Sequence, residues 1–164
     1  MTQTNLKQLL NPLNEDFTAK IIEPHSDINM EQLFVELPAD TMHRQRQLEL
    51  LILPDEDGVC FLQYFISLPY TVDKNQINEL SRLILKINAK LPLIGFGLLE
   101  EMQLIFFRCI VPCPDQPLED DVYVHTAHMI LYILDNFGPI LESLGNTEMS
   151  YDECINELMK YEND

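Results

Sequence analysis

Residues 59–91 decide the fold, and they read VCFLQYFISLPYTVDKNQINELSRLILKINAKL. In the first part of this stretch apolar residues alternate with residues of mixed polarity, and a period of two is typical of a β-strand. We therefore predict a strand over residues 59–68 that stops at Pro69, because proline has no backbone N–H to donate. The alternating apolar residues are Leu62, Tyr64 and Ile66.

The second part of the same stretch has a helical period. Its apolar residues lie three or four positions apart, which places them on one face of an α-helix. Asp73 is the predicted N-cap and Gln76 its capping-box partner, and Leu91–Pro92 ends the helix. The apolar positions are Ile77, Leu80, Ile84, Ile87 and Leu91.

On the N-terminal side of this stretch, residues 32–37 and 47–53 also alternate and are predicted strands. Pro54–Gly58 combines proline, aspartate and glycine, which is typical of a turn. Nearer the start, residues 5–10 favour a short helix that Pro12 ends. The segment 17–23 holds β-favouring side chains without a decisive pattern, and its state is left open.

On the C-terminal side, residues 93–99 and 102–111 are predicted strands joined by a tight turn. The prolines within 112–117 cannot continue a hydrogen-bonded ladder. A long helix is predicted from about Leu118, with a kink or break at Gly138–Pro139. Its predicted apolar face comprises Val122, Met129, Ile133, Phe137, Ile140 and Leu144.

A last short helix over residues 150–161 is capped by Ser150 with Glu153 at the capping-box position. Runs of strands separated by single helices predict an α+β fold, with an antiparallel sheet packed against helices. The 164 residues fit one domain.

The strands also predict which side chains share a face, because successive residues point to opposite faces. One set is almost wholly apolar, and we expect the chain's own helices to cover it. Its members are Leu33, Val35, Leu37, Leu48, Leu50, Ile52, Leu62, Tyr64, Ile66, Ile105, Phe107, Cys109 and Val111.

The opposite set mixes large apolar and polar side chains, and a face fully open to water is normally more polar. Exposed apolar patches often mark interaction sites, so we expect this face to meet another molecule; the alternative is that the C-terminal helices cover it. The candidate partner-binding residues are Phe61, Phe65, Phe106 and Arg108. The whole set is Phe34, Glu36, Gln47, Glu49, Leu51, Phe61, Gln63, Phe65, Ser67, Leu104, Phe106 and Arg108.

The net charge is −17, from 10 basic and 27 acidic residues. Such a charge opposes binding to nucleic acid or to an anionic membrane, and it leaves a basic or neutral protein as a partner. It equally suits a role in solubility alone. We find no signal peptide and no membrane span, and the four cysteines form no C-x-x-C pair. We therefore expect a cytoplasmic protein with reduced thiols.

No catalytic or cofactor-binding motif is present, and we expect neither an enzyme nor a bound cofactor or metal. The rival interpretation is a small metal-dependent protein that uses His125 and His128, which lie three residues apart with Asp121 one turn earlier. No fourth ligand can be identified for such a site.

Several residues resemble the YbjN domain family and the related class I type III secretion chaperones. They are the strand around Phe61–Phe65, Asn88 near the end of the central helix, the Gly95-Phe96-Gly97 bend and Arg108 in the following strand. The resemblance covers roughly residues 31–161, and residues 1–30 match loosely.

This resemblance implies an α-β-β-β-α-β-β-α order, a bacterial homodimer and no enzyme activity. It further implies a protein partner, such as an extended segment of an effector, held on apolar surface. A YbjN-type regulatory or stress-related protein without secretion clients is the alternative within the same resemblance. The Gly138–Pro139 pair and the helix after it depart from the pattern.

Overall fold

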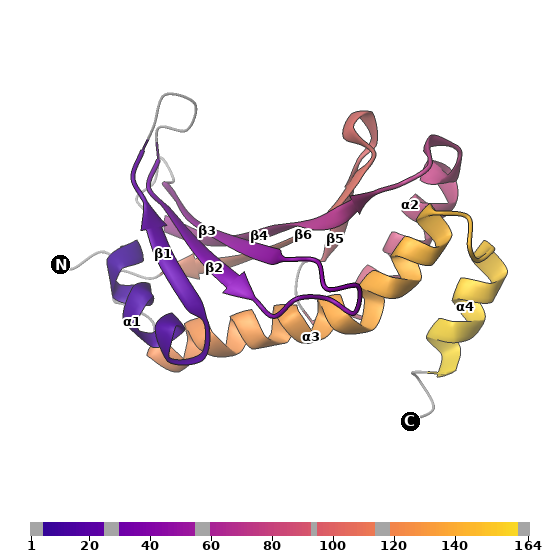
Figure 1. The fold of residues 1–164 in the computed structure, drawn as a ribbon. Helices are drawn as coiled ribbons and strands as arrows, with labels where there is room; N and C mark the ends of the chain where they lie inside the picture. Colours follow the sequence, from indigo (N-terminus) through magenta and orange to yellow (C-terminus); the bar gives the residue numbers. More distant parts are fainter. Residues whose placement is uncertain (1–4, 25–29, 55–59, 93–94, 114–118, 161–164) are drawn as a thin grey trace. The chain divides into compact units, whose positions relative to one another are not determined.

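The computed structural model describes residues 5–24, 30–54, 60–92, 95–113 and 119–160. The fold is α+β, as the sequence predicts, and these described ranges form a six-stranded antiparallel sheet of strand order β1-β2-β3-β4-β6-β5 and four α-helices (Figure 1). The helices are α1 (Leu6–Asp16), α2 (Ile77–Asn88), α3 (Asp120–Gly145) and α4 (Tyr151–Lys160). The strands are β1 (Thr18–Ile22), β2 (Gln32–Leu37), β3 (Arg46–Pro54), β4 (Cys60–Thr71), β5 (Phe96–Leu99) and β6 (Leu104–Cys113).

The segment whose state the sequence left open is strand β1, so four strands precede α2. Short 3₁₀ helices at Lys74–Gln76 and Glu100–Met102 lead into α2 and out of β5. Asp73 does act as a cap, but on the 3₁₀ turn, where its side chain accepts from the Asn75 N–H. The predicted Pro54–Gly58 turn lies largely outside the described residues.

The chain forms two compact units. Unit 1 comprises Met1–Ile66 and Arg108–Leu131, and unit 2 comprises Ser67–Phe107 and Tyr132–Asp164. Strands β4 and β6 and helix α3 therefore each contribute residues to both units, and the units are described separately below.

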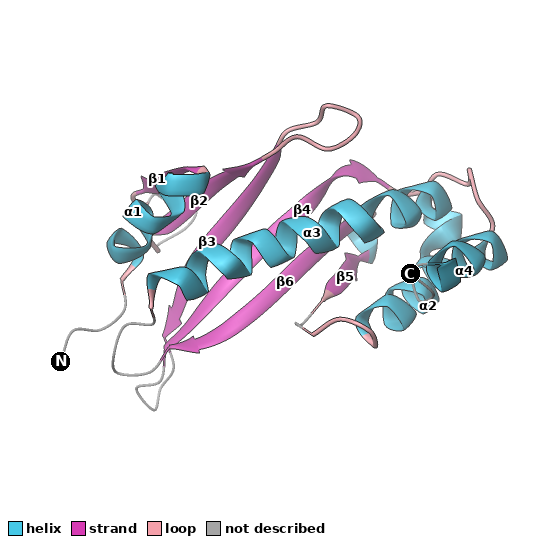
Figure 2. Ribbon diagram, turned by 90° about the horizontal axis from the view of Figure 1, so that it is seen from below, coloured by secondary structure: helices cyan, strands magenta, loops and turns pink. Residues whose placement is uncertain are grey.

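In unit 1, α1 and the first half of α3 lie against the same face of the sheet (Figures 1 and 2). That face is the predicted apolar one, and its residues are buried, except that Ile52 and Val111 are partly exposed. Helix α1 contributes Leu9 and Leu13, both fully buried. Burial of this apolar surface is the main stabilising term in unit 1.

In unit 2, α2 packs against α4 and β5. The Phe96 and Phe107 rings meet edge to face, with centroids 5.1 Å apart, and the Tyr70 hydroxyl donates a 2.9 Å hydrogen bond to the Gly138 carbonyl. The remaining core residues are Leu68, Val72, Leu80, Leu83, Ile84, Ile87, Ile105, Ile133, Leu134, Ile140, Leu141, Leu144, Cys154 and Leu158.

Several sequence predictions about proline are wrong. Pro12 lies inside α1, where it is buried with Leu9 and Leu13 and this burial offsets the lost helical hydrogen bond. Pro69 lies inside β4, beyond Phe65, where the pairing of β4 with β3 ends. Pro112 lies inside β6, beyond the residues that pair with β5. A proline at such an outer position removes no ladder bond on that side.

Helix α3 continues through Gly138–Pro139, so the predicted break is absent. The apolar face predicted for its first half is also displaced by about one residue. Val122 and Met129 are exposed, at 38% and 41%, while Tyr123 and Ala127 are buried. Apolar residues occur on all sides of this segment, so its period alone does not select the buried face.

The cap of α4 is confirmed. The Ser150 N–H and hydroxyl donate to the Glu153 carboxylate at 2.8 and 2.7 Å, and the Glu153 N–H donates to the Ser150 hydroxyl. No helix in the described ranges is both long enough and apolar enough to cross a membrane.

Candidate functional site

The second face of the sheet in unit 1 carries large apolar side chains that are only partly buried. Phe34 lies opposite Glu49 across β2 and β3, and Glu49 lies opposite Phe65 across β3 and β4. In the neighbouring rows Leu51 lies opposite Gln63 and Leu53 opposite Phe61. Phe34, Leu51, Leu53, Phe61 and Phe65 all have intermediate exposure. We call these five residues the open apolar patch.

Within the described part of the chain, no helix of unit 1 covers this patch, because α1 and the first half of α3 lie on the opposite face (Figure 2). The difference between the faces is sharp along one strand. Leu62 and Tyr64 of β4 are at most 1% exposed, whereas Phe61, Gln63 and Phe65 remain partly accessible. The alternation predicted from the sequence therefore holds in unit 1.

Polar residues interrupt the patch and limit its apolar area. Gln32 donates a side-chain hydrogen bond to Glu49, and it is only 3% exposed although it lies on the open face. Lys20 approaches Glu36 at 3.8 Å, with both side chains more than half exposed. Sequence reasoning missed the Gln32–Glu49 pair because its partners lie on different strands.

The four predicted partner-binding residues do not all belong to one unit. Phe61 and Phe65 lie on the open face of β4, and Arg108 is exposed on β6, also in unit 1. Phe106 belongs to unit 2, where its ring lies over Gly97: a Cβ added to that glycine would lie 2.3 Å from Cζ of Phe106. We therefore confine the candidate site to the residues of unit 1.

On each edge strand of the sheet, an asparagine side chain bonds the backbone of one residue. At the β1 edge, Asn14 of α1 accepts from the Ala19 N–H at 2.8 Å and donates to the Ala19 carbonyl at 3.2 Å. At the β5 edge, Asn88 of α2 makes the same pair with Phe96, at 2.8 Å each. In each case a carboxamide takes the place of a neighbouring strand. An open edge is a template for strand addition, so at these residues the edges are protected and the broad face is the accessible surface.

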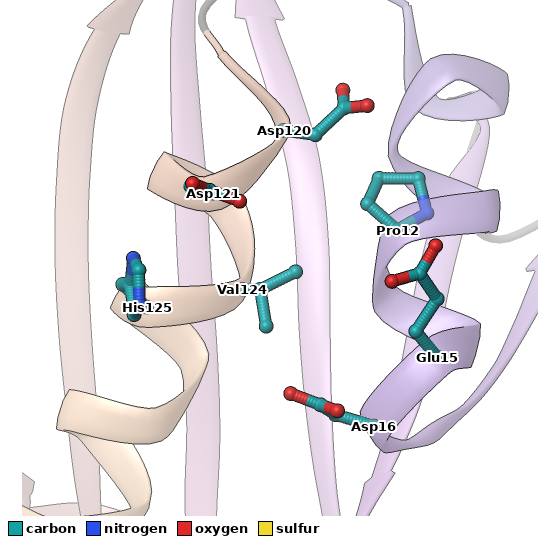
Figure 3. Close-up of a pocket in the computed structure, with 7 residues that line it drawn as sticks. All are labelled: Pro12, Glu15, Asp16, Asp120, Asp121, Val124 and His125. Atoms are coloured by element: carbon teal, nitrogen blue, oxygen red, sulfur yellow. The ribbon is translucent and has the colours of Figure 1, made fainter.

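The histidines do not converge on a metal site in the described ranges. A hollow of about 360 Å³ between α1 and α3 is lined by Glu15, Asp16, Asp120, Asp121 and His125, together with Pro12 and Val124 (Figure 3). His128 instead contacts the Asp16 carboxylate at 2.8 Å, and its ring packs against Phe17. No group of three or more His, Cys, Asp or Glu side chains in the described residues is arranged to hold a metal ion.

All four cysteines are thiols rather than disulfides, and Cys109, Cys113 and Cys154 are buried. Burial raises the pKa of the Cys109 thiol. It also raises the pKa of Cys154, assisted by the nearby Glu153 and Glu157 charges. A raised pKa keeps a thiol protonated at neutral pH, and the protonated form is a poor nucleophile.

The sequence matches no protein-family model and no curated protein with which it was compared. The resemblance to YbjN proteins and secretion chaperones therefore remains a prediction. Some of the residues that carry it have structural roles here. Asn88 holds the backbone of Phe96, and Gly95 leaves room for it, because a Cβ there would lie 2.0 Å from Oδ1 of Asn88.

Proposed function

We propose that this chain is a non-enzymatic binding module that holds a segment of another protein on the open apolar patch of unit 1. The observation that carries the proposal is the partial exposure of Phe34, Leu51, Leu53, Phe61 and Phe65 on a face that no described helix of unit 1 covers. Partly exposed apolar side chains gathered on one sheet face often mark an interaction site.

The complex would be stabilised mainly by burial of apolar surface, and charge would act mainly on the rate of association. Burying one large side chain stabilises a complex by roughly 1.5–3 kcal/mol. The net charge of −17 favours encounter with a basic partner and does not oppose a neutral one. Because Asn14 and Asn88 each occupy the outer backbone groups of one edge residue, we place the partner across the face. An effector segment of the kind that secretion chaperones bind is one partner consistent with this mode.

The test is residue-specific crosslinking in the cell of origin. A photo-crosslinking amino acid is placed at Phe61 or Phe65, and at the exposed Tyr132 of unit 2 as a reference position. We expect one protein to be captured at both patch positions and not at the reference. Equal capture at all three positions, or none, would contradict the proposal. Capture of a second copy of this chain would instead assign the patch to a homodimer interface.

A matched pair of variants then separates apolar contact from charge. Phe61→Glu with Phe65→Glu adds two negative charges and removes two rings, whereas Gln47→Glu with Gln63→Glu adds two negative charges to the same face alone. We expect only the phenylalanine pair to abolish binding, with an unchanged circular dichroism spectrum. Unfolding of the phenylalanine pair would mean that the two rings belong to the core.

A further inference from the structure

A second hollow lies in unit 2, between helices α2 and α4, which run side by side (Figure 2). It has a volume of about 340 Å³. Its lining combines apolar side chains with two lysines. The lining residues are Lys86, Ala89, Lys90, Ile155, Leu158 and Met159.

The two helices bring a row of cations alongside a row of apolar side chains. Arg82 and Lys86 lie four residues apart on α2 and so share one side of that helix, and Lys90 lies in the turn that follows the helix. Arg82 is already engaged, since it contacts Glu79 at 3.0 Å and lies 4.2 Å above the Tyr151 ring. Lys86 makes no ion pair with any residue that the structure describes.

Two lysines, Lys86 and Lys90, line one hollow in a chain that has only 10 basic residues against 27 acidic ones. A cation in the last turn of a helix complements its dipole, and this explains the position of Lys86 in α2. The helix dipole does not explain why an apolar hollow lies beside the lysines. Met159 lines this hollow and is 52% exposed. Cations next to an apolar hollow suit a ligand that has both negative charge and an apolar group.

We propose that the hollow between α2 and α4 binds an acidic peptide segment of another protein through one apolar anchor residue. The volume lies at the small end of the range for ligand pockets, which suits a single anchor. Lys86 would pair with a carboxylate beside the anchor residue. Repulsion from the rest of the protein is screened beyond about 8 Å at physiological salt, so the nearby lysines decide the preference.

The test uses fluorescence anisotropy with a short labelled peptide that has one central leucine flanked by glutamates. Its counterpart has lysines in place of the glutamates. We expect the acidic peptide to bind and the basic one to bind at least about tenfold more weakly, a difference of about 1.4 kcal/mol. No binding of the acidic peptide, or equal binding of both, would overturn the proposal.

Two matched variant pairs locate the site. Lys86→Glu with Lys90→Glu should weaken binding about tenfold, whereas Lys7→Glu with Lys74→Glu makes the same charge change at exposed lysines outside the hollow and should not. Met159→Ser should weaken binding and Met102→Ser, at another exposed methionine, should not. Equal losses within either pair would refute the assignment.

Two further measurements separate the α2–α4 hollow from the open apolar patch and from a homodimer interface. Phe61→Glu with Phe65→Glu should leave peptide binding unchanged, so failure of the open apolar patch and failure of the hollow can be told apart. Sedimentation without peptide tests whether a second copy occupies the hollow. A dimer that dissociates when Lys86 and Lys90 are reversed would assign the hollow to that second copy and overturn the proposal.

Discussion

Removal of the Asn88 side chain tests the closure of the β5 edge. In Asn88→Ala, the Phe96 N–H and carbonyl both lose a 2.8 Å partner, and Phe96 is only 4% exposed. A hydrogen bond contributes roughly 1 kcal/mol net, and a buried polar group left without a partner costs roughly 1–3 kcal/mol. The expected loss of stability in unit 2 is therefore about 2–4 kcal/mol.

The neighbouring glycine makes this prediction sharper. A Cβ at Gly95 would lie 2.0 Å from Oδ1 and 2.7 Å from Cγ of Asn88, so Gly95→Ala must displace the same carboxamide. Each single variant should lose the same two hydrogen bonds, and the double variant should lose them only once. We expect a coupling free energy of about 2 kcal/mol, in the sense that the double variant is more stable than the sum of losses predicts.

The assay is urea denaturation followed by circular dichroism, because the chain has no tryptophan, together with amide exchange at Phe96. The predicted loss corresponds to exchange about 30- to 700-fold faster. Asn88→Asp should also lose stability, since a carboxylate accepts from the Phe96 N–H but cannot donate to the Phe96 carbonyl. Asn78→Ala, at an exposed position of the same helix, is the control and should change stability by less than about 0.5 kcal/mol. Additive losses at Asn88 and Gly95, or unchanged exchange at Phe96, would refute the closure of the edge by Asn88.

Three further predictions follow from local geometry. Thr147 has a φ of 62°, which lies in the left-handed region that a β-branched residue rarely adopts. Thr147→Gly should therefore stabilise the protein by about 1 kcal/mol, measured by urea denaturation. Glu148→Gly is the control and should destabilise the protein, because Glu148 has no positive φ to relieve. Because Cys109, Cys113 and Cys154 are buried, iodoacetamide should label Cys60 first in the native protein, and mass spectrometry that finds Cys154 labelled as fast would contradict the packing of α4. Hydrogen bonds from the Ser150 N–H and hydroxyl lower the pKa of Glu153 in the folded protein. The stability that these bonds contribute is complete above the unfolded-state pKa of Glu153 and is lost as pH falls through its folded-state pKa. Amide protection in α4 should therefore decrease on acidification, and Glu153→Gln should remove that dependence.

The candidate site could be predicted only in part. The open face of β4 was predictable because side chains alternate strictly along a strand, and Phe61 and Phe65 lie where the period places them. The grouping with Phe106 was not, because a period says nothing about how a chain divides into units. The contacts of Asn14 and Asn88 with the edge strands carried no sequence signal, since the fold brings those strands near, and the position of Lys86 and Lys90 beside α4 was likewise decided by the fold.

The sequence by itself determined the α+β class, the buried and open faces of the strands, and the Ser150–Glu153 cap, because these depend on periods and on contacts within a few residues. Only the tertiary structure decided that Pro12, Pro69 and Pro112 lie inside elements. A proline ends a helix or strand only if its missing N–H removes a hydrogen bond that the element needs. Burial of apolar surface around the proline can offset that loss. The phase of α3 was decided in the same way, by which of its many apolar residues the sheet had room to bury.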